Sequence, residues 1–158
     1  MNNSWDEIII VGLGNHSKTK IIPAIQKTCL SKISILSNKT ILDSKYKIYN
    51  SLEKALENNQ KKLFVLSNPP KVHYEYCKKI LKNGFDLFVE KPIFLNNSEL
   101  EESINIAKTK RLVLYEMFMY LENDTVNETL QLIKNNLNKI QNIYTCFNLP
   151  SYPINTYR

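Results

Sequence analysis

Cysteine is scarce in this chain, which has Cys29, Cys77 and Cys146. Their odd number and wide spacing exclude a disulfide framework and do not match the spacing of zinc ligands. His73 and Cys77 are one helical turn apart, but without further ligands nearby they favour ordinary packing. We therefore expect reduced, buried thiols and no bound metal.

Long apolar runs are also missing. A helix needs roughly 20 consecutive apolar residues to cross a bilayer, and no run in the sequence approaches that length. The start, Met1–Glu7, is polar and acidic, unlike a secretory signal. We therefore expect no membrane partner and a cytoplasmic location.

Arginine is rare and basic clusters are absent. The net charge is +6, but there are only two arginines, and the longest basic runs are pairs such as Lys61-Lys62. Nucleic-acid binding requires clustered positive charge, so we expect no nucleic-acid partner. The 43% hydrophobic and 23% charged residues are typical of a soluble, folded chain.

Short apolar runs alternate with amphipathic stretches. This pattern predicts an α/β fold: a Rossmann-like, doubly wound parallel sheet with helices on its faces. The expected strands are Glu7–Val11, Lys32–Leu36, Lys62–Leu66, Asp86–Glu90, Arg111–Tyr115 and Ile140–Leu149. The expected helices are Ser17–Leu30, a helix that follows Ser51 and runs through Asn58, Lys71–Asn83, Ser98–Lys108 and Asp124–Asn136.

Local signals refine these helices. Gly84 predicts a C-terminal cap. Ser98 and Glu101 have the spacing of a capping box, and Pro23 requires the first helix to start late or bend. Because crossovers between parallel strands are right-handed, we expect all strand C-termini to meet at one edge, where ligands bind in open α/β sheets.

The first strand runs into a glycine turn. Gly12, Leu13, Gly14, Asn15, His16 and Ser17 form a G-x-G-x-x-S run between a strand and a helix. Gly12 permits a tight turn, and Gly14 lets the backbone approach a pyrophosphate at the helix N-terminus. The pattern favours a dinucleotide site, with an ordinary turn as the alternative; Ser17 replaces the usual third Gly or Ala.

The second predicted strand lacks the acid that would bind the ribose of NAD. No acidic residue lies between Glu7 and Asp43, and the strand runs into Ser37, Asn38 and Lys39. A hydroxyl, an amide and a cation suit a 2′-phosphate. The cofactor is therefore NADP or NAD, with a lean towards NADP. The equally open alternative is that Lys39 is an ordinary exposed lysine.

The middle of the chain carries two linked motifs. The run Phe64–His73 contains Ser67-Asn68-Pro69, and Gly84 precedes the run Phe88–Pro92, which contains Glu90-Lys91-Pro92. This arrangement resembles the glucose-fructose oxidoreductase and inositol dehydrogenase family, Gfo/Idh/MocA. The run Tyr115–Tyr120 resembles the E-x-F-M-Y sequence of its dihydrodiol-dehydrogenase-like branch.

The resemblance implies roles for these residues. Ser67, Asn68, Pro69 and His73 would line the dinucleotide, with helix capping or surface packing as alternatives for His73. Glu90 and Lys91 would reach the nicotinamide region, and Lys91 would be the catalytic cation that stabilises charge on the reacting oxygen. A plain solvent-facing lysine is the alternative reading of Lys91.

The pattern also departs from the family. Residues 1–121 would form the NAD(P)-binding domain and 122–158 the connecting helix and the first strand of a truncated substrate domain. Only about ten residues, Lys39–Ile48, replace the helix usual after the second strand, and Leu121 stands where the branch has arginine. Tyr115, Tyr120 and His16 are the possible substitutes for a missing acid-base partner.

Two functions are compatible with these observations. The first is hydride transfer between NAD(P) and a sugar, polyol or related carbonyl or imine substrate, which needs a further segment, a second copy or a completing subunit. The second is a non-catalytic, degenerate nucleotide-binding or scaffold module. The specific substrate does not follow from the sequence.

Overall fold

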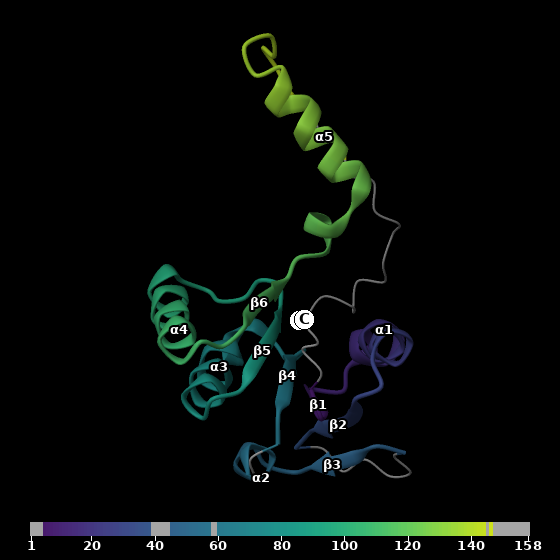
Figure 1. Ribbon diagram of the computed structural model, residues 1–158, viewed down its shortest axis with the longest axis vertical. Helices are drawn as coiled ribbons and strands as arrows, with labels where there is room; N and C mark the ends of the chain where they lie inside the picture. The colour runs from purple at the N-terminus through teal and green to yellow at the C-terminus, as the bar shows by residue number, and fades with distance from the viewer. Residues whose placement is uncertain (1–4, 39–44, 58–59, 145, 147–158) are drawn as a thin grey trace. The chain divides into compact units, whose positions relative to one another are not determined.

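The computed structural model describes residues 5–38, 45–57, 60–144 and 146. The chain forms two compact units, Met1–Phe118 and Met119–Arg158. The first unit is built around a parallel sheet of six strands in the order β3-β2-β1-β4-β5-β6 (Figure 1). The strands are β1 (Glu7–Val11), β2 (Lys32–Leu36), β3 (Lys47–Tyr49), β4 (Lys62–Leu66), β5 (Asp86–Glu90) and β6 (Leu114–Met117).

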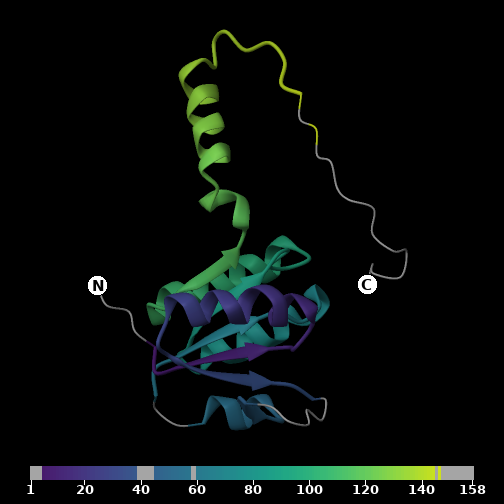
Figure 2. The same cartoon turned by 90° about the vertical axis from the view of Figure 1, so that its right-hand side faces the viewer.

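This order confirms the predicted Rossmann-like class. Strands β1, β2, β4 and β5 have the predicted bounds, because each is an apolar run next to a neighbouring strand: Ile9 pairs with both Ser34 and Phe64. The strands all run in one direction (Figure 2), so their carboxyl ends share one edge. The loops that follow the strands therefore lie at that edge, where the sequence predicts the site.

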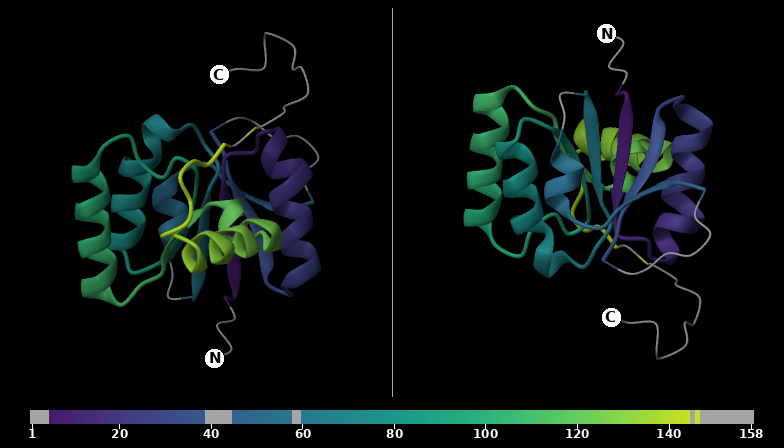
Figure 3. Two further views of the ribbon diagram at one scale, coloured as in Figure 1. Left: turned by 90° about the horizontal axis from the view of Figure 1, so that it is seen from above. Right: turned by 90° about the horizontal axis from the view of Figure 1, so that it is seen from below.

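Helices cover both faces of this sheet (Figure 3). One face carries α2 (Leu52–Leu56), α3 (His73–Lys82) and α4 (Asn97–Lys110), and the other carries α1 (Ile22–Thr28). The helical turns η1 (Ser17–Ile21) and η2 (Pro70–Val72) precede α1 and α3. Each face therefore has its own core.

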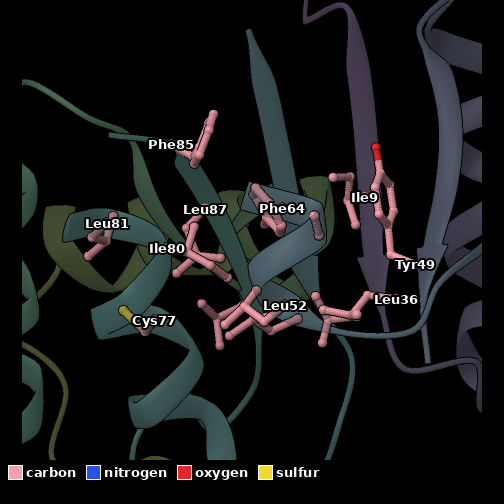
Figure 4. Packing of buried hydrophobic residues seen from close by; sticks show 14 of the residues in the cluster. Ile9, Leu36, Tyr49, Leu52, Phe64, Cys77, Ile80, Leu81, Phe85 and Leu87 are labelled. Atoms are coloured by element: carbon pink, nitrogen blue, oxygen red, sulfur yellow. The ribbon is translucent and has the colours of Figure 1, made fainter. Parts of the chain in front are cut away.

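The larger core lies between the sheet and α3. Side chains from α3, including Cys77 and Ile80, pack on Phe64 and Leu87 of the central strands (Figure 4). These four residues have 0% exposed surface. Burying a side chain of this size contributes about 1.5–3 kcal/mol, so the α3 face anchors the strands that end at the site.

The first helical segment differs from its prediction. Ser17–Ile21 is a π-helical turn, in which the Ile22 N–H bonds to the Ser17 carbonyl. Ordinary α-helix follows from Ile22, with Pro23 in its first turn, and ends at Thr28 rather than at Leu30. The wider π turn agrees with the expected bend, because Pro23 lacks the N–H that an interior helical position requires.

Three further elements differ from their prediction. The α4 N-cap is Asn96, whose side chain accepts a hydrogen bond from the Glu99 N–H at 3.0 Å, so Ser98 and Glu101 form no capping box. Strand β6 is Leu114–Met117 instead of Arg111–Tyr115, because Arg111 adopts the left-handed conformation that ends α4. The three-residue strand β3 was not predicted.

Other helix ends match their sequence signals more closely. Ser51 is the N-cap of α2, and its side chain accepts a hydrogen bond from Lys54 N–H. Gly84 adopts φ +85° just after α3, as the predicted C-terminal cap requires. The expected buried thiols are only partly right: Cys77 is buried, but Cys29 is partly exposed and Cys146 exposed.

The second unit contains η3 (Met119–Glu122) and α5 (Asp124–Asn135). The Asn123 side chain caps α5 by accepting a hydrogen bond from Val126 N–H at 3.1 Å. Residues 140–144 and 146 are in neither helix nor strand. The strand predicted from Ile140 is therefore wrong for these residues, and the others of Ile140–Leu149 lie outside the described part.

Candidate functional site

The turn after β1 is pressed against the turn after β4. Gly12 has φ +94°, and a Cβ added to it would lie 3.2 Å from the Ser67 carbonyl oxygen and 3.3 Å from the Asn68 nitrogen. Gly12 also donates its N–H to the Leu36 carbonyl at 3.0 Å. Conformation and space both require glycine here, as the sequence predicted for a tight turn.

Gly14 has different surroundings. A Cβ at Gly14 would meet nothing within 4 Å, so the backbone here borders open space. Its carbonyl accepts a hydrogen bond from the Lys18 N–H, and the neighbouring Asn15 is exposed. The glycine turn therefore presents open backbone at the start of a helix, the arrangement that suits an anionic group.

Ser17 links the two turns. Its buried hydroxyl lies 2.9 Å from both the Gly12 carbonyl oxygen and the Ser67 hydroxyl oxygen. The sequence identified Ser17 only as a small substitute for a third glycine. The bond to Ser67 depends on tertiary structure, so spacing alone could not reveal it.

Asn68 has an unsatisfied acceptor. Its side-chain oxygen is buried and has no hydrogen-bond partner among the described residues. A buried acceptor without a donor costs about 1–3 kcal/mol, and the hydroxyl and amide groups of a dinucleotide are suitable donors. The following Pro69 is exposed and precedes η2. The turn therefore fits the dinucleotide that the sequence predicted there.

His73 lies deeper than predicted. It has 0% exposed surface, which excludes surface packing, and its ring nitrogens contact protein carbonyl groups. Nε2 is 2.8 Å from the backbone carbonyl oxygen of Asn68, and Nδ1 is 3.1 Å from the backbone carbonyl oxygens of both Pro92 and Ile93. These contacts join two turns of the edge.

Glu90 and His16 meet across the edge. The His16 Nε2 and Glu90 Oε1 atoms are 2.8 Å apart, and the side chains are 48% and 20% exposed. His16 comes from the glycine turn and Glu90 from the end of β5, so the two residues are far apart in the sequence. The structure therefore brings together two of the predicted site residues as an accessible pair.

Lys91 follows β5 directly and is exposed. Its N–H donates to Glu90 Oε2 at 3.3 Å, and its peptide bond to Pro92 is cis. The next residue, Ile93, donates its N–H to Glu116 Oε1 at 2.9 Å. Sequence reasoning did not assign a role to Glu116, although it belongs to the E-x-F-M-Y run.

The end of β2 is described only in part. Ser37 is half-buried and donates its N–H to the Tyr49 carbonyl at 3.1 Å, and Asn38 is exposed. Lys39 lies outside the described residues. The strand β3 begins at Lys47, after the short connection noted in the sequence.

A polar network around the buried carboxylate of Glu7 lies elsewhere, near the start of β1. The carboxylate of Glu7 accepts hydrogen bonds from Ser34 at 2.5 Å and from Tyr49 at 3.1 Å, and Lys47 donates to the Tyr49 hydroxyl at 2.7 Å. Burial raises the pKa of Tyr49 and lowers that of Lys62. These groups belong to no predicted site.

The described residues offer neither a metal centre nor a membrane span. Nowhere in ranges 5–38, 45–57 and 60–144 or at 146 do three or more His, Cys, Asp or Glu side chains gather as metal ligands would. None of the helices in the same residues has the length and apolar character needed to span a bilayer.

The fold and the paired turns define a dinucleotide-binding α/β domain of the Rossmann type. Residues 7–118 match the oxidoreductase family Gfo/Idh/MocA in its NAD-binding Rossmann fold. The chain belongs to this family.

Two similar proteins indicate how much of a full-length relative the chain spans. An uncharacterised oxidoreductase of Schizosaccharomyces pombe is 37% identical over 68 residues, which are 43% of this chain and 18% of that protein. Oxidoreductase P35 of Formosa agariphila is 26% identical over 127 residues, 72% of this chain and 40% of the relative. The chain thus spans less than half the length of either relative.

A solved structure shares the fold. KijD10, a 3-ketoreductase from Actinomadura kijaniata, was solved as the Y186F mutant with TDP-benzene and NADP. It superposes with a TM-score of 0.73 at 18% identity, covering 83% of this chain and 42% of its own. At this identity the match supports the fold alone.

Proposed function

We propose that this chain binds NADP, or less tightly NAD, at the carboxyl edge of its sheet and uses it in hydride transfer. The observation that carries the proposal is the contact between the turns at Gly12 and Asn68. Gly12 permits close approach of backbone to backbone, and Asn68 offers a buried oxygen without a donor. Both features suit a bound dinucleotide.

The preference for NADP rests on charge. No acidic residue lies between Glu7 and Asp43, and Ser37 and Asn38 stand directly after β2, where an acid would select NAD. The KijD10 structure with NADP is compatible with this preference. Lys39 would add a cation for the 2′-phosphate.

The bound cofactor would supply or accept the hydride. The residues of this chain would stabilise the developing charge and transfer the proton. Lys91, exposed at the end of β5, would place its ammonium group beside the reacting oxygen and stabilise the negative charge that develops there. His16 and Glu90, paired at 2.8 Å, would carry a proton to or from that oxygen.

The substrate would be a sugar, polyol, or related carbonyl or imine compound. We propose that residues 1–121 hold the cofactor and that 122–158 begin the region that holds this substrate. A second copy or another subunit would complete the site if the chain acts at this length.

Titration of the full chain with NADPH and NADH tests the binding step. Nicotinamide fluorescence is the better signal, because the sole tryptophan, Trp5, donates to Asp86 at the start of β5, the opposite end of that strand from Lys91. We expect saturation with NADPH at lower concentration than with NADH. No saturable signal up to millimolar concentration of either cofactor would refute the proposal.

Turnover separates the enzyme from a binding module. Oxidation of NADPH is followed with sugars, inosose-type ketones and imines as acceptors, for the native chain and Lys91→Met. Lys110→Met is the control, because Lys110 is an exposed lysine at the end of α4. Turnover that is lost in Lys91→Met and unchanged in Lys110→Met supports catalysis by this chain. NADPH binding without turnover of any acceptor supports the non-catalytic binding module.

A further inference from the structure

His73 connects the two turns that carry the proposed site. We propose that His73 is a positioning residue, whose ring fixes the turn at Asn68 relative to the turn that follows Lys91. This inference rests on the proposed function, since those turns hold the proposed cofactor and catalytic groups. It assigns His73 a role that differs from the direct cofactor contact that the resemblance implied.

The chemistry of the contacts supports this role. Carbonyl oxygens only accept hydrogen bonds, so a ring nitrogen facing one is satisfied only when it carries a hydrogen. Nε2 faces the backbone carbonyl oxygen of Asn68, and Nδ1 faces the backbone carbonyl oxygens of Pro92 and Ile93. Either neutral tautomer bonds one turn, and the ring with both hydrogens bonds both.

The turn after Lys91 is held on its other side by β6. Ile93 donates its N–H to the Glu116 carboxylate at 2.9 Å, and Glu116 is in register with Val89 of β5. Ile93 therefore has its carbonyl on His73 and its N–H on Glu116. The backbone beside Lys91 is fixed from both α3 and β6, although the Lys91 side chain is exposed.

Such bracing has a functional use. A catalytic group misplaced by about 1 Å can lose most of its effect, and groups on turns depend on supporting hydrogen bonds for their position. Asn68 is placed through its carbonyl by His73, while its side-chain oxygen has no partner among the described residues. The hydrogen bonds of His73, here called the brace, thus orient that side-chain oxygen without bonding to it.

A core histidine without this role would behave differently. Its removal would lower global stability and leave the two turns otherwise alike in the folded state. Cys77 provides the comparison, because it lies one turn further along α3, is also 0% exposed and packs in the core. Cys77→Ala should destabilise the fold without loosening either turn.

Replacing His73 by Asn or by Gln separates the two sides of the brace. The Asn amide nitrogen takes the place of Nδ1 and can still bond Pro92 and Ile93, whereas the Gln amide nitrogen takes the place of Nε2 and can still bond Asn68. His73→Phe fills the space and bonds neither.

Backbone amide hydrogen exchange of the full chain, measured by mass spectrometry, tests this design. We expect His73→Asn to speed exchange mainly in residues 66–70, His73→Gln mainly in 91–95, and His73→Phe in both. The expected change is about five- to tenfold, as for loss of one hydrogen bond. Cys77→Ala should exchange like the native chain in both segments.

NADPH titration completes the test. His73→Phe should weaken NADPH binding about tenfold, while Cys77→Ala binds as the native chain does despite a lower melting temperature. The inference would be overturned if the three His73 variants showed the same exchange pattern as one another. It would also be overturned if Cys77→Ala lost as much NADPH affinity as His73→Phe. If the native chain itself does not bind NADPH, the proposed function fails, and the exchange pattern still decides the brace.

Discussion

Gly12 and Ser67 come so close that a Cβ at Gly12 would lie 3.2 Å from the Ser67 carbonyl oxygen. The contact joins the ends of β1 and β4, which are neighbours in the sheet. It makes the glycine turn and the Asn-Pro turn one structural element. Changes to either turn should therefore affect cofactor binding as well as stability.

Gly12→Ala should destabilise the fold and weaken NADPH binding. A non-glycine residue at φ +94° costs about 1–3 kcal/mol in backbone strain, and the added Cβ also pushes the Ser67 turn away. Urea denaturation and NADPH titration measure the two effects. Gly84→Ala is the matched control, because Gly84 has φ +85° but open space around a Cβ.

We expect Gly84→Ala to lose stability by strain alone and to bind NADPH normally. Equal affinities for Gly12→Ala and Gly84→Ala would mean that the Gly12 contact does not shape the site.

Ser17→Ala removes the hydroxyl that links the two turns. We expect a loss of about 1 kcal/mol in the free energy of unfolding and weaker NADPH binding, because Ser67 and Gly12 lose a shared partner. Ser103→Ala is the control: Ser103 is also 0% exposed and bonds the Glu99 carbonyl at 2.7 Å within α4. A Ser17→Ala chain that is destabilised but keeps native affinity would contradict the linking role.

Much of this sheet could be predicted from sequence, and the exceptions have physical causes. The bounds of β1, β2, β4 and β5 follow from apolar runs buried between neighbours. Strand β3 is three residues long, too short for a periodic pattern. Strand β6 starts later than predicted because Arg111 adopts the left-handed conformation, which glycine adopts most readily.

The site was predicted less completely. The glycine turn and the residues around Lys91 carry local signals, and the structure brings His16 and Glu90 together. The burial of His73 and the role of Glu116 depend on contacts between turns that are distant in sequence. Local patterns contain no information on those contacts, so the sequence left cofactor contact, helix capping and surface packing open for His73.

Lys62→Met should destabilise the chain outside the site. Lys62 is 1% exposed, and its Nζ donates to the carbonyls of Ala55 at 2.7 Å and Glu57 at 2.5 Å near the end of α2. Leaving these carbonyls without a donor should cost about 2–4 kcal/mol. Lys61→Met, at the exposed neighbouring position, should change stability by less than about 0.5 kcal/mol.

The pH dependence gives a second readout for Lys62. Burial lowers its pKa below 10.5, so as pH rises the folded chain releases this proton before the unfolded chain does. Between the two pKa values, the contribution of Lys62 to the free energy of unfolding therefore increases with pH. The stability difference between native and Lys62→Met chains should widen as pH approaches 10.5; urea denaturation that shows a constant difference would contradict the lowered pKa.

Ser37→Asp tests the origin of cofactor preference. A carboxylate directly after β2 can accept hydrogen bonds from the ribose hydroxyls of NADH but repels the 2′-phosphate of NADPH. We expect the ratio of the NADPH and NADH dissociation constants to shift toward NADH by on the order of tenfold, since about 1.4 kcal/mol of repulsion has that effect.

The control for this shift is Ser51→Asp, which adds the same charge at the N-cap of α2, where Asp also caps well. Its cofactor ratio should stay native, so that a change in net charge alone is separated from charge at the β2 end. Because the repulsion is electrostatic and the position is partly exposed, raising the salt concentration should reduce the Ser37→Asp shift. A shift that is the same in both variants, or that does not respond to salt, would mean that residues other than those after β2 select the cofactor.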